Sequence, residues 1–317
     1  MTTKARQATA LLDRMPSGFT TRFAPAPTGH LHLGHLVNAI WVWGLAAARG
    51  GRVLLRIEDH DRGRCRPEFE RSILDDLDWL GLVPDAAGTD DFRRGPTPHR
   101  QSDNLARYEA VLRELEAEGR AYPCICSRTE IARANAEMGQ PDRAGQEQRY
   151  PGSCRDRGLG ADVTLARRLV VRESNLEEFK DLRLGPQAQD PPSQCGDVLL
   201  RDRAGNFTYQ FAVVVDDFDQ GVNVVIRGED LLDSTGRQLR IAKLIGRPAP
   251  PRFLHHPLVL HPDGSKLSKS AGDTGIGELR SNGASAAELL GRAAGLAGLG
   301  HDGLPIHAQD LAGLFAR

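Results

Sequence analysis

The stretch PTGHLHLGHLVNAIWVW, residues 27–43, decides the fold, because it joins a histidine-rich loop to an apolar run that predicts a helix. Backbone N–H groups at the start of a helix are unpaired and carry a partial positive charge, so this start suits an anion such as phosphate. Gly34 would let a phosphate approach the backbone, and His32 and His35 would donate hydrogen bonds to it. By itself, His-x-Gly-His fits a nucleotide site and a structural loop about equally well.

The neighbouring segments alternate between strand and helix patterns. A short strand in TTRFAPAPTG precedes the histidines, and the helix follows over about residues 36–48. GRVLLRIED has the pattern of a buried strand, and PEFERSILDDLDWLGL predicts an amphipathic helix that ends at Gly81. Another amphipathic helix is predicted over residues 101–118. This order predicts an α/β fold with a doubly wound parallel sheet.

The amino-acid composition of the chain changes at about residue 121. Residues 121–194 are rich in Pro, Gly, Gln and Arg, which indicates an insertion. Residues 197–232 return to strand-like patterning, with turns at residues 204–206 and 220–221. A helix in STGRQLRIAKLIG follows, and the remainder after Ser270 predicts one or two short helices.

Composition limits the classes of protein to which the chain can belong. The 317 residues can form a large domain with an insertion, and 40% hydrophobic with 26% charged content is ordinary for a globular protein. We find no apolar stretch of about 18 residues and no signal-peptide core, so we expect a cytoplasmic protein without a membrane partner. The net charge of −1 gives no overall sign of a nucleic-acid partner.

Lysine is rare in this chain, which makes the segment SKLSKS, residues 265–270, conspicuous. Five of the 41 basic residues are Lys, and two of the five, Lys266 and Lys269, stand here. An ammonium on a flexible stem can follow a polyphosphate as it moves, whereas arginine suits fixed planar contacts. The lysine pair therefore favours a phosphate site, and a solvated surface turn is the weaker interpretation.

Three of the five cysteines form a possible metal site. Cys124 and Cys126 are followed by Cys154, and this spacing is compatible with a zinc knuckle that closes a polar loop. Zinc takes four ligands, and no histidine stands in this region. On chemistry alone Tyr150, Asp156 and water remain open as the fourth ligand. Cys65 and Cys195 are expected to be free thiols, and a chance cluster of thiols is the alternative to a zinc site.

The motifs together resemble a known family. HLGH with KLSKS is similar to the paired signature of class I aminoacyl-tRNA synthetases, and RFAPAPTGHLHLGH and LLRIEDHDRGR resemble the glutamate-specific branch. The resemblance covers residues 22–270, with Leu267 where the signature commonly has methionine. It implies a Rossmann-type catalytic domain with an inserted α+β zinc subdomain that resembles an acceptor-binding domain. We then expect a flexible leader at 1–19, the first catalytic half at 20–120, the insertion at 121–195 and the second catalytic half at 196–275. A short helical tail at 276–317, without an anticodon-binding domain, completes the expected organisation.

In that family the carboxylate of the amino acid attacks the α-phosphate of ATP, which arrives with Mg²⁺, and pyrophosphate leaves. The resemblance implies that ATP is bound by His32, Gly34, His35 and Lys269, and that the catalytic residues are His32, His35, Lys266 and Lys269. It implies glutamate contacts at Arg22, Phe23, Ala24, Pro25, Ala26, Glu58, Tyr209 and Arg227. Two arginines disfavour glutamine, whose neutral amide would leave one of them unpaired.

Within this family, the chain resembles one truncated subgroup in particular. Its members bind one Zn²⁺ through a Cys-x-Cys…Tyr-x₃-Cys pattern, which implies Tyr150 as the fourth ligand. They activate glutamate without tRNA and transfer it onto queuosine in the anticodon arm of tRNA(Asp). A minimal glutamyl-tRNA synthetase, an inactive tRNA-binding paralogue and a nucleotidyltransferase are the alternatives. Nothing in the sequence requires more than a monomer.

Overall fold

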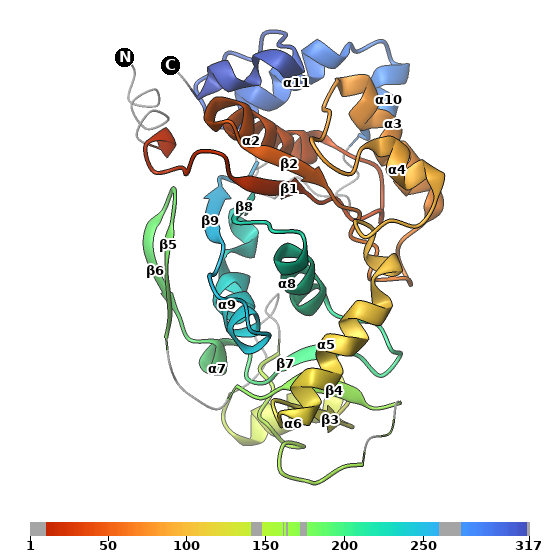
Figure 1. The fold of residues 1–317 in the computed structure, drawn as a ribbon, viewed down its shortest axis with the longest axis vertical. Helices are drawn as coiled ribbons and strands as arrows, with labels where there is room; N and C mark the ends of the chain where they lie inside the picture. Colours follow the sequence, from red (N-terminus) through yellow and green to blue (C-terminus); the bar gives the residue numbers. More distant parts are fainter. Residues whose placement is uncertain are drawn as a thin grey trace.

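The computed structural model describes residues 11–140, 148–160, 162, 164–171, 176–259 and 274–315. In Figure 1 the strands β1, β2, β8 and β9 lie in the upper part of the molecule, and β3, β4 and β7 lie at its lower end. Helix α5, Leu105–Ala117, runs toward the lower end. None of the helices in these ranges has the length and apolar character needed to cross a membrane.

The strands of the upper part form a two-stranded sheet, β1–β2, and a four-stranded sheet, β6–β5–β9–β8, which lie side by side. Their pairs are mainly parallel, which confirms the predicted α/β fold. β1 pairs with β2 and β8 pairs with β9, both in parallel. β1 lies beside β8, where the Asn223 N–H donates to the Thr20 carbonyl over 3.0 Å. β5 joins β9 in parallel at Asp181 and forms an antiparallel hairpin with β6. The strands are Thr20–Phe23 (β1), Arg52–Leu55 (β2), Glu177–Asp181 (β5), Gly185–Gln189 (β6), Val224–Gly228 (β8) and Arg252–His256 (β9).

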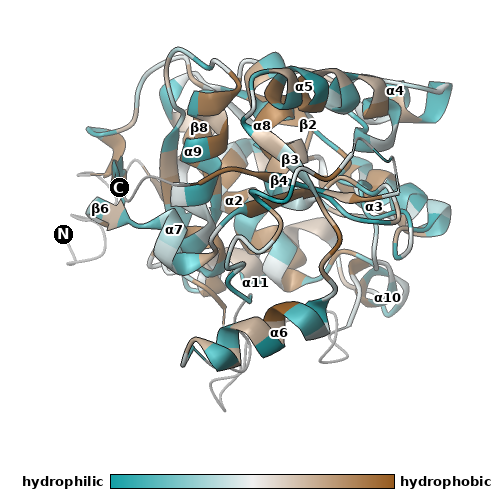
Figure 2. Ribbon diagram, turned by 90° about the horizontal axis from the view of Figure 1, so that it is seen from below, coloured by the Kyte–Doolittle hydropathy of each residue, from teal (hydrophilic) through white to brown (hydrophobic). Residues whose placement is uncertain are grey.

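Helices cover this sheet where the periodic pattern predicted them. α2, Leu33–Arg49, begins earlier than expected because His32 caps its first turn. α3, Pro67–Leu80, ends at Gly81 in the left-handed conformation, φ 71°, as predicted. The other helical segments are α4 Thr89–Arg94, η1 Gln101–Asp103, α7 Pro191–Gln194, η2 Glu229–Ser234, α9 Thr235–Leu244, α10 Ile276–Ser281, α11 Ala286–Leu296 and η4 Ala308–Leu314. Figure 2 shows hydrophobic residues along the central elements and hydrophilic ones on peripheral helices such as α4.

The C-terminal segment packs closely on α2. Gly44 faces the Phe315 ring, which a Cβ at this position would overlap. Phe315 also meets Trp41 edge-on, with ring centroids 5.3 Å apart. The segment is therefore part of the core around α2.

Residues 11–19 differ from the flexible leader that we expected. Leu11, Met15 and Phe19 are buried in the core, and Arg49 donates a hydrogen bond to the Met15 carbonyl over 2.9 Å. Burying these three apolar side chains holds the segment in place. Residues 1–10 lie outside the described ranges.

The lower sheet forms most of the predicted insertion, with two differences at its borders. Strands β3, β4 and β7 are antiparallel and span Ala121–Cys124, Ala166–Leu169 and Val198–Arg201, with α6 at Arg128–Glu137. β7 was expected in the second catalytic half but completes this sheet. The hairpin of β5 and β6 was expected in the insertion but joins the catalytic sheet.

The strand-like pattern predicted over residues 197–232 is wrong in its centre. Residues 209–219 form a helix, α8, Tyr209–Asp219. Its three consecutive valines favour a strand by propensity, but all three are buried in the helix against surrounding elements. Packing from several sides overrides local propensity here.

Asp76 on α3 should make stability depend on pH. Its side chain is buried, its Oδ2 has no hydrogen-bond partner among the described residues, and burial raises its pKa to about 6, against a lowering by Arg280. The pKa is above that of the unfolded chain, so this group lowers stability as the pH rises from about 4 to about 6. We expect Asp76→Asn to increase the free energy of unfolding by ~2 kcal/mol at pH 8 and to leave it unchanged near pH 4. Urea denaturation at both pH values measures this. Asp90→Asn, at an exposed site, should show little change, and an equal gain for Asp76→Asn at both pH values would contradict the assignment.

Candidate active site

The polar side chains of the candidate site gather where the parallel strands end, next to the start of α2. Open α/β sheets bind ligands at this edge. Arg22 is the next-to-last residue of β1, Glu58 follows β2, and Arg227 stands near the end of β8. All three are buried, at 4%, 7% and 3% exposure. The structure therefore brings together three predicted glutamate contacts from separate parts of the sequence.

Tyr209, at the start of α8, belongs to the same group. Burial raises the pKa of its hydroxyl. Glu58 raises this pKa further, whereas Arg227 and Arg22 lower it. Burial lowers the pKa of Arg227, and Tyr209 counters this. Tyr209 thus lies close to the three charged residues.

Residues 23–26, which follow Arg22, contribute mainly through their backbone. The Pro25 carbonyl accepts a hydrogen bond from the Glu58 N–H at 3.1 Å, and the Phe23 carbonyl accepts one from the Arg56 N–H at 3.0 Å. The Phe23 ring is buried in the core and packs on Trp43, with centroids 5.1 Å apart. Ala24 and Ala26 are half-buried. This segment fixes the position of the loop that carries Glu58.

The sequence analysis did not identify two residues behind the site, Arg56 and Asp217. Arg56 is fully buried and donates from Nη1 to Asp217 over 2.7 Å and from Nη2 to Glu58 over 2.9 Å. The same Asp217 oxygen accepts from Arg22 Nε at 3.0 Å. Arg56 therefore positions Glu58 directly and Arg22 through Asp217. An arginine inside the apolar strand LLRIED and an acidic pair inside VVVDDF were the signals available in the sequence.

Ionisation follows from this arrangement. Burial lowers the pKa of Arg56, but Asp217, Glu58 and Asp216 outweigh burial and raise it. Burial raises the pKa of Asp217, but Arg22 and Arg56 outweigh burial and lower it. Arg56 and Asp217 thus remain charged at neutral pH. Burial raises the pKa of the adjacent Asp216 to about 6, and Arg56 opposes this rise.

The two predicted glutamate-binding arginines differ in how many of their donors are already used. Arg22 donates from Nε to Asp217 and from Nη1 to the Ile226 carbonyl at 3.5 Å, and its Nη2 makes no hydrogen bond within the described part of the chain. Arg227 uses Nε, Nη1 and Nη2 in bonds to other protein groups. Arg22 alone thus presents an open guanidinium edge suited to a carboxylate.

The two histidines of the His-x-Gly-His motif are oriented by the backbone of α2. His32 is the N-cap, and its Nδ1 accepts from the Gly34 N–H at 3.1 Å. His35 Nδ1 accepts from the His32 N–H, also at 3.1 Å, and the two rings lie 4.0 Å apart. Because both Nδ1 atoms accept, each neutral ring carries its proton on Nε2. Both imidazoles then present an N–H donor, which is the group that phosphate oxygens require.

Lys266 and Lys269 lie outside the described residues. The chain that follows them is described and lies beside the histidines. The Ile276 N–H donates to the Leu31 carbonyl over 2.8 Å, next to His32, and a Cβ at Gly275 would lie 3.1 Å from His30 Cβ. Ile276 follows Lys269 by seven positions.

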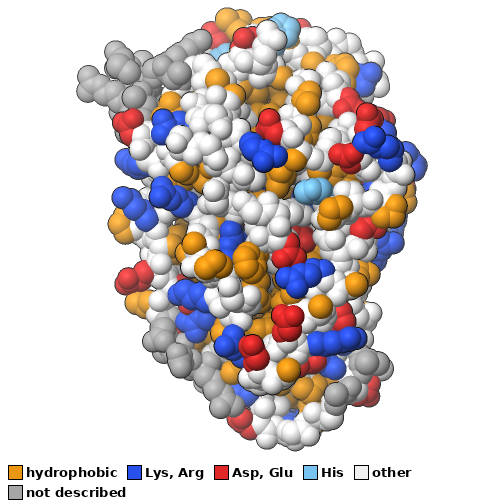
Figure 3. Space-filling model, in the orientation of Figure 1, with side chains coloured by type: hydrophobic (Ala, Val, Ile, Leu, Met, Phe, Trp, Pro, Cys, Tyr) orange, Lys and Arg blue, Asp and Glu red, His pale blue; other side chains and the backbone are white. Residues whose placement is uncertain are grey.

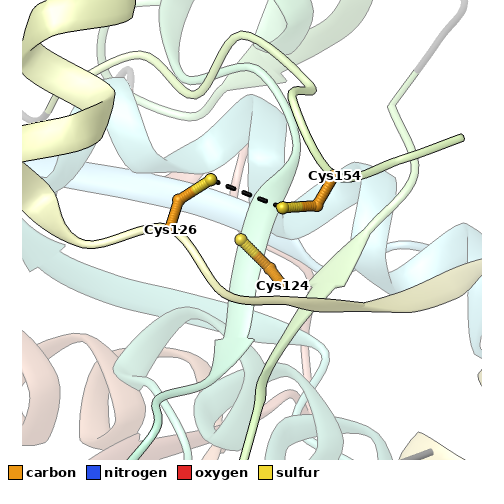
Figure 4. Close-up of side chains that lie close together, drawn as sticks. All are labelled: Cys124, Cys126 and Cys154. Carbon is orange, nitrogen blue, oxygen red and sulfur yellow. Dashed lines mark hydrogen bonds between the residues drawn. The ribbon is translucent and has the colours of Figure 1, made fainter. Parts of the chain in front are cut away.

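The predicted metal ligands form one cluster in the insertion. Figure 4 shows the thiols of Cys124, Cys126 and Cys154 directed toward one another, and the three sulfur atoms lie within 4.8 Å of each other. Among the described residues this is the one group of three or more His, Cys, Asp or Glu side chains so arranged, and Asp156 is not part of it. The Tyr150 hydroxyl lies 3.3 Å from Cys124 Sγ and 3.7 Å from Cys126 Sγ. The donor set fits a tetrahedral zinc site.

Two further contacts fix Tyr150. Its ring is covered by the Arg168 guanidinium, 3.8 Å from the ring centroid. Its backbone lies against Gly196, which has φ 65°, and a Cβ there would overlap the Tyr150 carbonyl. A left-handed glycine is therefore required for this close approach.

Comparison with known proteins agrees with this geometry. Residues 19–300 match the family described as tRNA synthetases class I (E and Q), catalytic domain. The chain belongs to this family of class I tRNA synthetases. It is 40% identical over 308 residues to the glutamyl-Q tRNA(Asp) synthetase of Symbiobacterium thermophilum, covering 93% of this chain and 91% of that protein. It is 42% identical over 296 residues to the glutamyl-Q tRNA(Asp) synthetase of Ralstonia nicotianae, covering 93% and 87%.

Full glutamate–tRNA ligases are also similar. Glutamate–tRNA ligase 1 of Halorhodospira halophila is 39% identical over 309 residues, covering 93% of this chain and 61% of that protein. The crystal structure of a glutamate tRNA ligase from Elizabethkingia meningosepticum in complex with its amino acid superposes with a TM-score of 0.75 at 26% identity. The chain covers 64% of that solved chain.

Proposed function

We propose that this chain activates glutamate with ATP, without tRNA, and transfers it to queuosine at the wobble position of tRNA(Asp). The observation that carries the proposal is the convergence of Arg22, Glu58 and Arg227, at the strand ends, with Tyr209 at the start of α8. It occurs in a chain that is 40% identical, over nine-tenths of its length, to a glutamyl-Q tRNA(Asp) synthetase.

Glutamate has two carboxylates and one ammonium, and the site offers matching charges. The open edge of Arg22 receives one carboxylate bidentately. Glu58 is held by Arg56 and accepts the ammonium. Arg227 and Tyr209 contact the remaining carboxylate. A neutral amide in place of either carboxylate would leave a buried arginine poorly paired, which disfavours glutamine.

Activation requires positioning and charge neutralisation. A carboxylate oxygen of glutamate attacks the α-phosphorus of ATP, and the bond from this phosphorus to the bridging oxygen breaks, which releases pyrophosphate. The attacking group is already an anion, so no general base is needed. The Nε2–H groups of His32 and His35 and the start of α2 bind phosphate oxygens, and Lys266 and Lys269 neutralise the departing charge. Mg²⁺ arrives with ATP.

Transfer uses the same adenylate. A hydroxyl of queuosine attacks the glutamyl carbonyl carbon, AMP leaves, and an ester forms. Figure 3 shows that Lys and Arg side chains on the face in view are dispersed among acidic ones. With a net charge of −1, contacts to tRNA phosphates must be local, and we place them on the insertion and around the site.

Zinc in the insertion is proposed to be held by Cys124, Cys126, Cys154 and Tyr150, and its role there is structural. We expect Cys124→Ser to lose bound zinc and Tyr150→Phe to weaken zinc affinity by ~10–100-fold, because three thiolates remain. Atomic emission of the purified proteins and competition with a chromogenic chelator measure this. Cys195→Ser, a buried thiol outside the cluster, should keep one zinc. Unchanged affinity in Tyr150→Phe would assign the fourth position to another ligand.

Glutamate-dependent exchange of labelled pyrophosphate into ATP tests the activation step. We expect exchange with glutamate in the absence of tRNA, and much slower exchange with glutamine. Absence of exchange under these conditions would favour an inactive tRNA-binding paralogue. Exchange without any amino acid would favour a nucleotidyltransferase.

A further inference from the structure

A row of buried side chains crosses three neighbouring strands behind the amino-acid site. Asp181 ends β5, His255 lies on β9, and Arg227 lies on β8. Asp181 Oδ2 is 2.7 Å from His255 Nδ1, and Arg227 Nε donates to His255 Nε2 over 3.0 Å. Asp181 and His255 are completely buried, and Arg227 is 3% exposed. Asp181 and His255 were not among the predicted site residues.

The hydrogen bonds of Asp181 fix the direction of this row. Its Oδ1 accepts from the backbone N–H groups of Arg183 and Leu184, at 2.9 and 2.8 Å. Its Oδ2 accepts from the His255 N–H at 3.1 Å as well as from the ring. A carboxylate in this position holds the His255 proton on Nδ1, so Nε2 is left as an acceptor for Arg227. Burial lowers the pKa of His255, which agrees with a neutral ring.

The remaining bonds of Arg227 leave its guanidinium little freedom. Nη1 donates to Gln238 Oε1 over 2.7 Å, and Nη2 donates to Thr235 Oγ1 over 2.8 Å and to the Leu231 carbonyl over 3.1 Å. With the bond to His255, four of its five N–H groups have protein acceptors. The fifth is on Nη1, and Tyr209 is a partner of this guanidinium.

We propose that His255, oriented by Asp181, is a positioning residue that fixes the plane of Arg227 in the glutamate site. The N–H of Arg227 that faces Tyr209 and the substrate then keeps a set direction, while Arg22 offers an open edge. The two arginines thus have different tasks: Arg22 binds one carboxylate of glutamate bidentately, and Arg227 sets the orientation of the other carboxylate. This inference rests on the proposed function, because it takes Arg227 as a glutamate contact.

Two substitutions of His255 separate positioning from packing. In His255→Gln the amide oxygen can take the place of Nε2 and accept from Arg227, whereas in His255→Asn the amide reaches Asp181 only. We expect His255→Asn to raise the KM for glutamate ~10-fold or more, with the KM for ATP within ~2-fold of wild type. His255→Gln should restore the KM for glutamate to within ~3-fold of wild type. Pyrophosphate exchange measures both constants, and His307→Gln, at an exposed site, is the control.

A thermal-shift titration with glutamate on the same proteins keeps the test independent of catalysis. If both variants lose thermal stability equally and show the same KM for glutamate, His255 only packs and the proposal is overturned. If wild type binds glutamate but shows no exchange, the proposed function fails, while the ratio of glutamate affinities of the Asn and Gln variants still decides the role of His255. If wild type binds no glutamate, both are overturned.

Discussion

Arg56→Met is expected to lower the free energy of unfolding by ~3–5 kcal/mol and to abolish glutamate activation, because removing one partner leaves buried charges uncompensated. Arg56 is fully buried and pairs with Asp217 and Glu58 at 2.7 and 2.9 Å. Without it, the buried Glu58 loses its arginine partner, and Asp217 keeps only its pair with Arg22. Urea denaturation and glutamate-dependent pyrophosphate exchange measure the two effects.

Arg56→Lys addresses the case in which the methionine variant does not fold. An ammonium keeps the charge but cannot span both carboxylates as the planar guanidinium does. We expect this variant to fold, with the KM for glutamate raised ~10-fold. Arg64→Met removes an exposed ion pair with Asp61 and should change stability by less than ~0.5 kcal/mol. Wild-type stability in Arg56→Met would contradict the role given to this residue.

Lys269→Ala is expected to lower the rate of adenylate formation by ~10²–10³-fold, with only a modest effect on glutamate binding. The ammonium is assigned to charge that develops on the departing pyrophosphate, so its loss raises the barrier and leaves the ground-state complex with glutamate. Single-turnover formation of glutamyl-adenylate, together with glutamate binding by thermal shift, separates the two quantities.

Lys180→Ala provides the matched control for this substitution. Lys180 is exposed on β5, and its removal should leave the rate of adenylate formation unchanged. Lys266→Ala should show a loss of the same kind as Lys269→Ala. Pyrophosphate exchange at the wild-type rate in Lys269→Ala would contradict the phosphate site.

How much of the fold could be read from the sequence depends on how local each signal is. The helix α3 and its end at Gly81 follow from periodicity and from one left-handed glycine, both within the segment itself. The α8 helix could not be predicted in this way, because its valines favour a strand and the helix is stabilised by packing with distant elements. The hairpin of β5 and β6 joins the catalytic sheet through one parallel pair with β9, some 70 positions further along the chain.

The residues of the candidate site also divide into those that a local motif marks and those that depend on distant contacts. The motifs identified Arg22, Glu58, Tyr209 and Arg227 through resemblance to a family, and the structure places them together. The residues that support them were not identified, because each makes its contacts far along the chain. Arg56 bonds to Asp217, 161 positions away, and no local pattern marks such a pair. Buried polar residues in apolar segments are the sequence signal that corresponds to such support.

Transfer of labelled glutamate to tRNA(Asp) tests the central claim most directly. Four substrates are compared: tRNA(Asp) with and without queuosine, each with its 3′-terminal adenosine intact or removed. The account predicts label only on queuosine-bearing tRNA, in equal amounts with and without the terminal adenosine. Label on queuosine-free tRNA that disappears when the adenosine is removed would contradict it and would define a glutamyl-tRNA synthetase acting at the 3′ end.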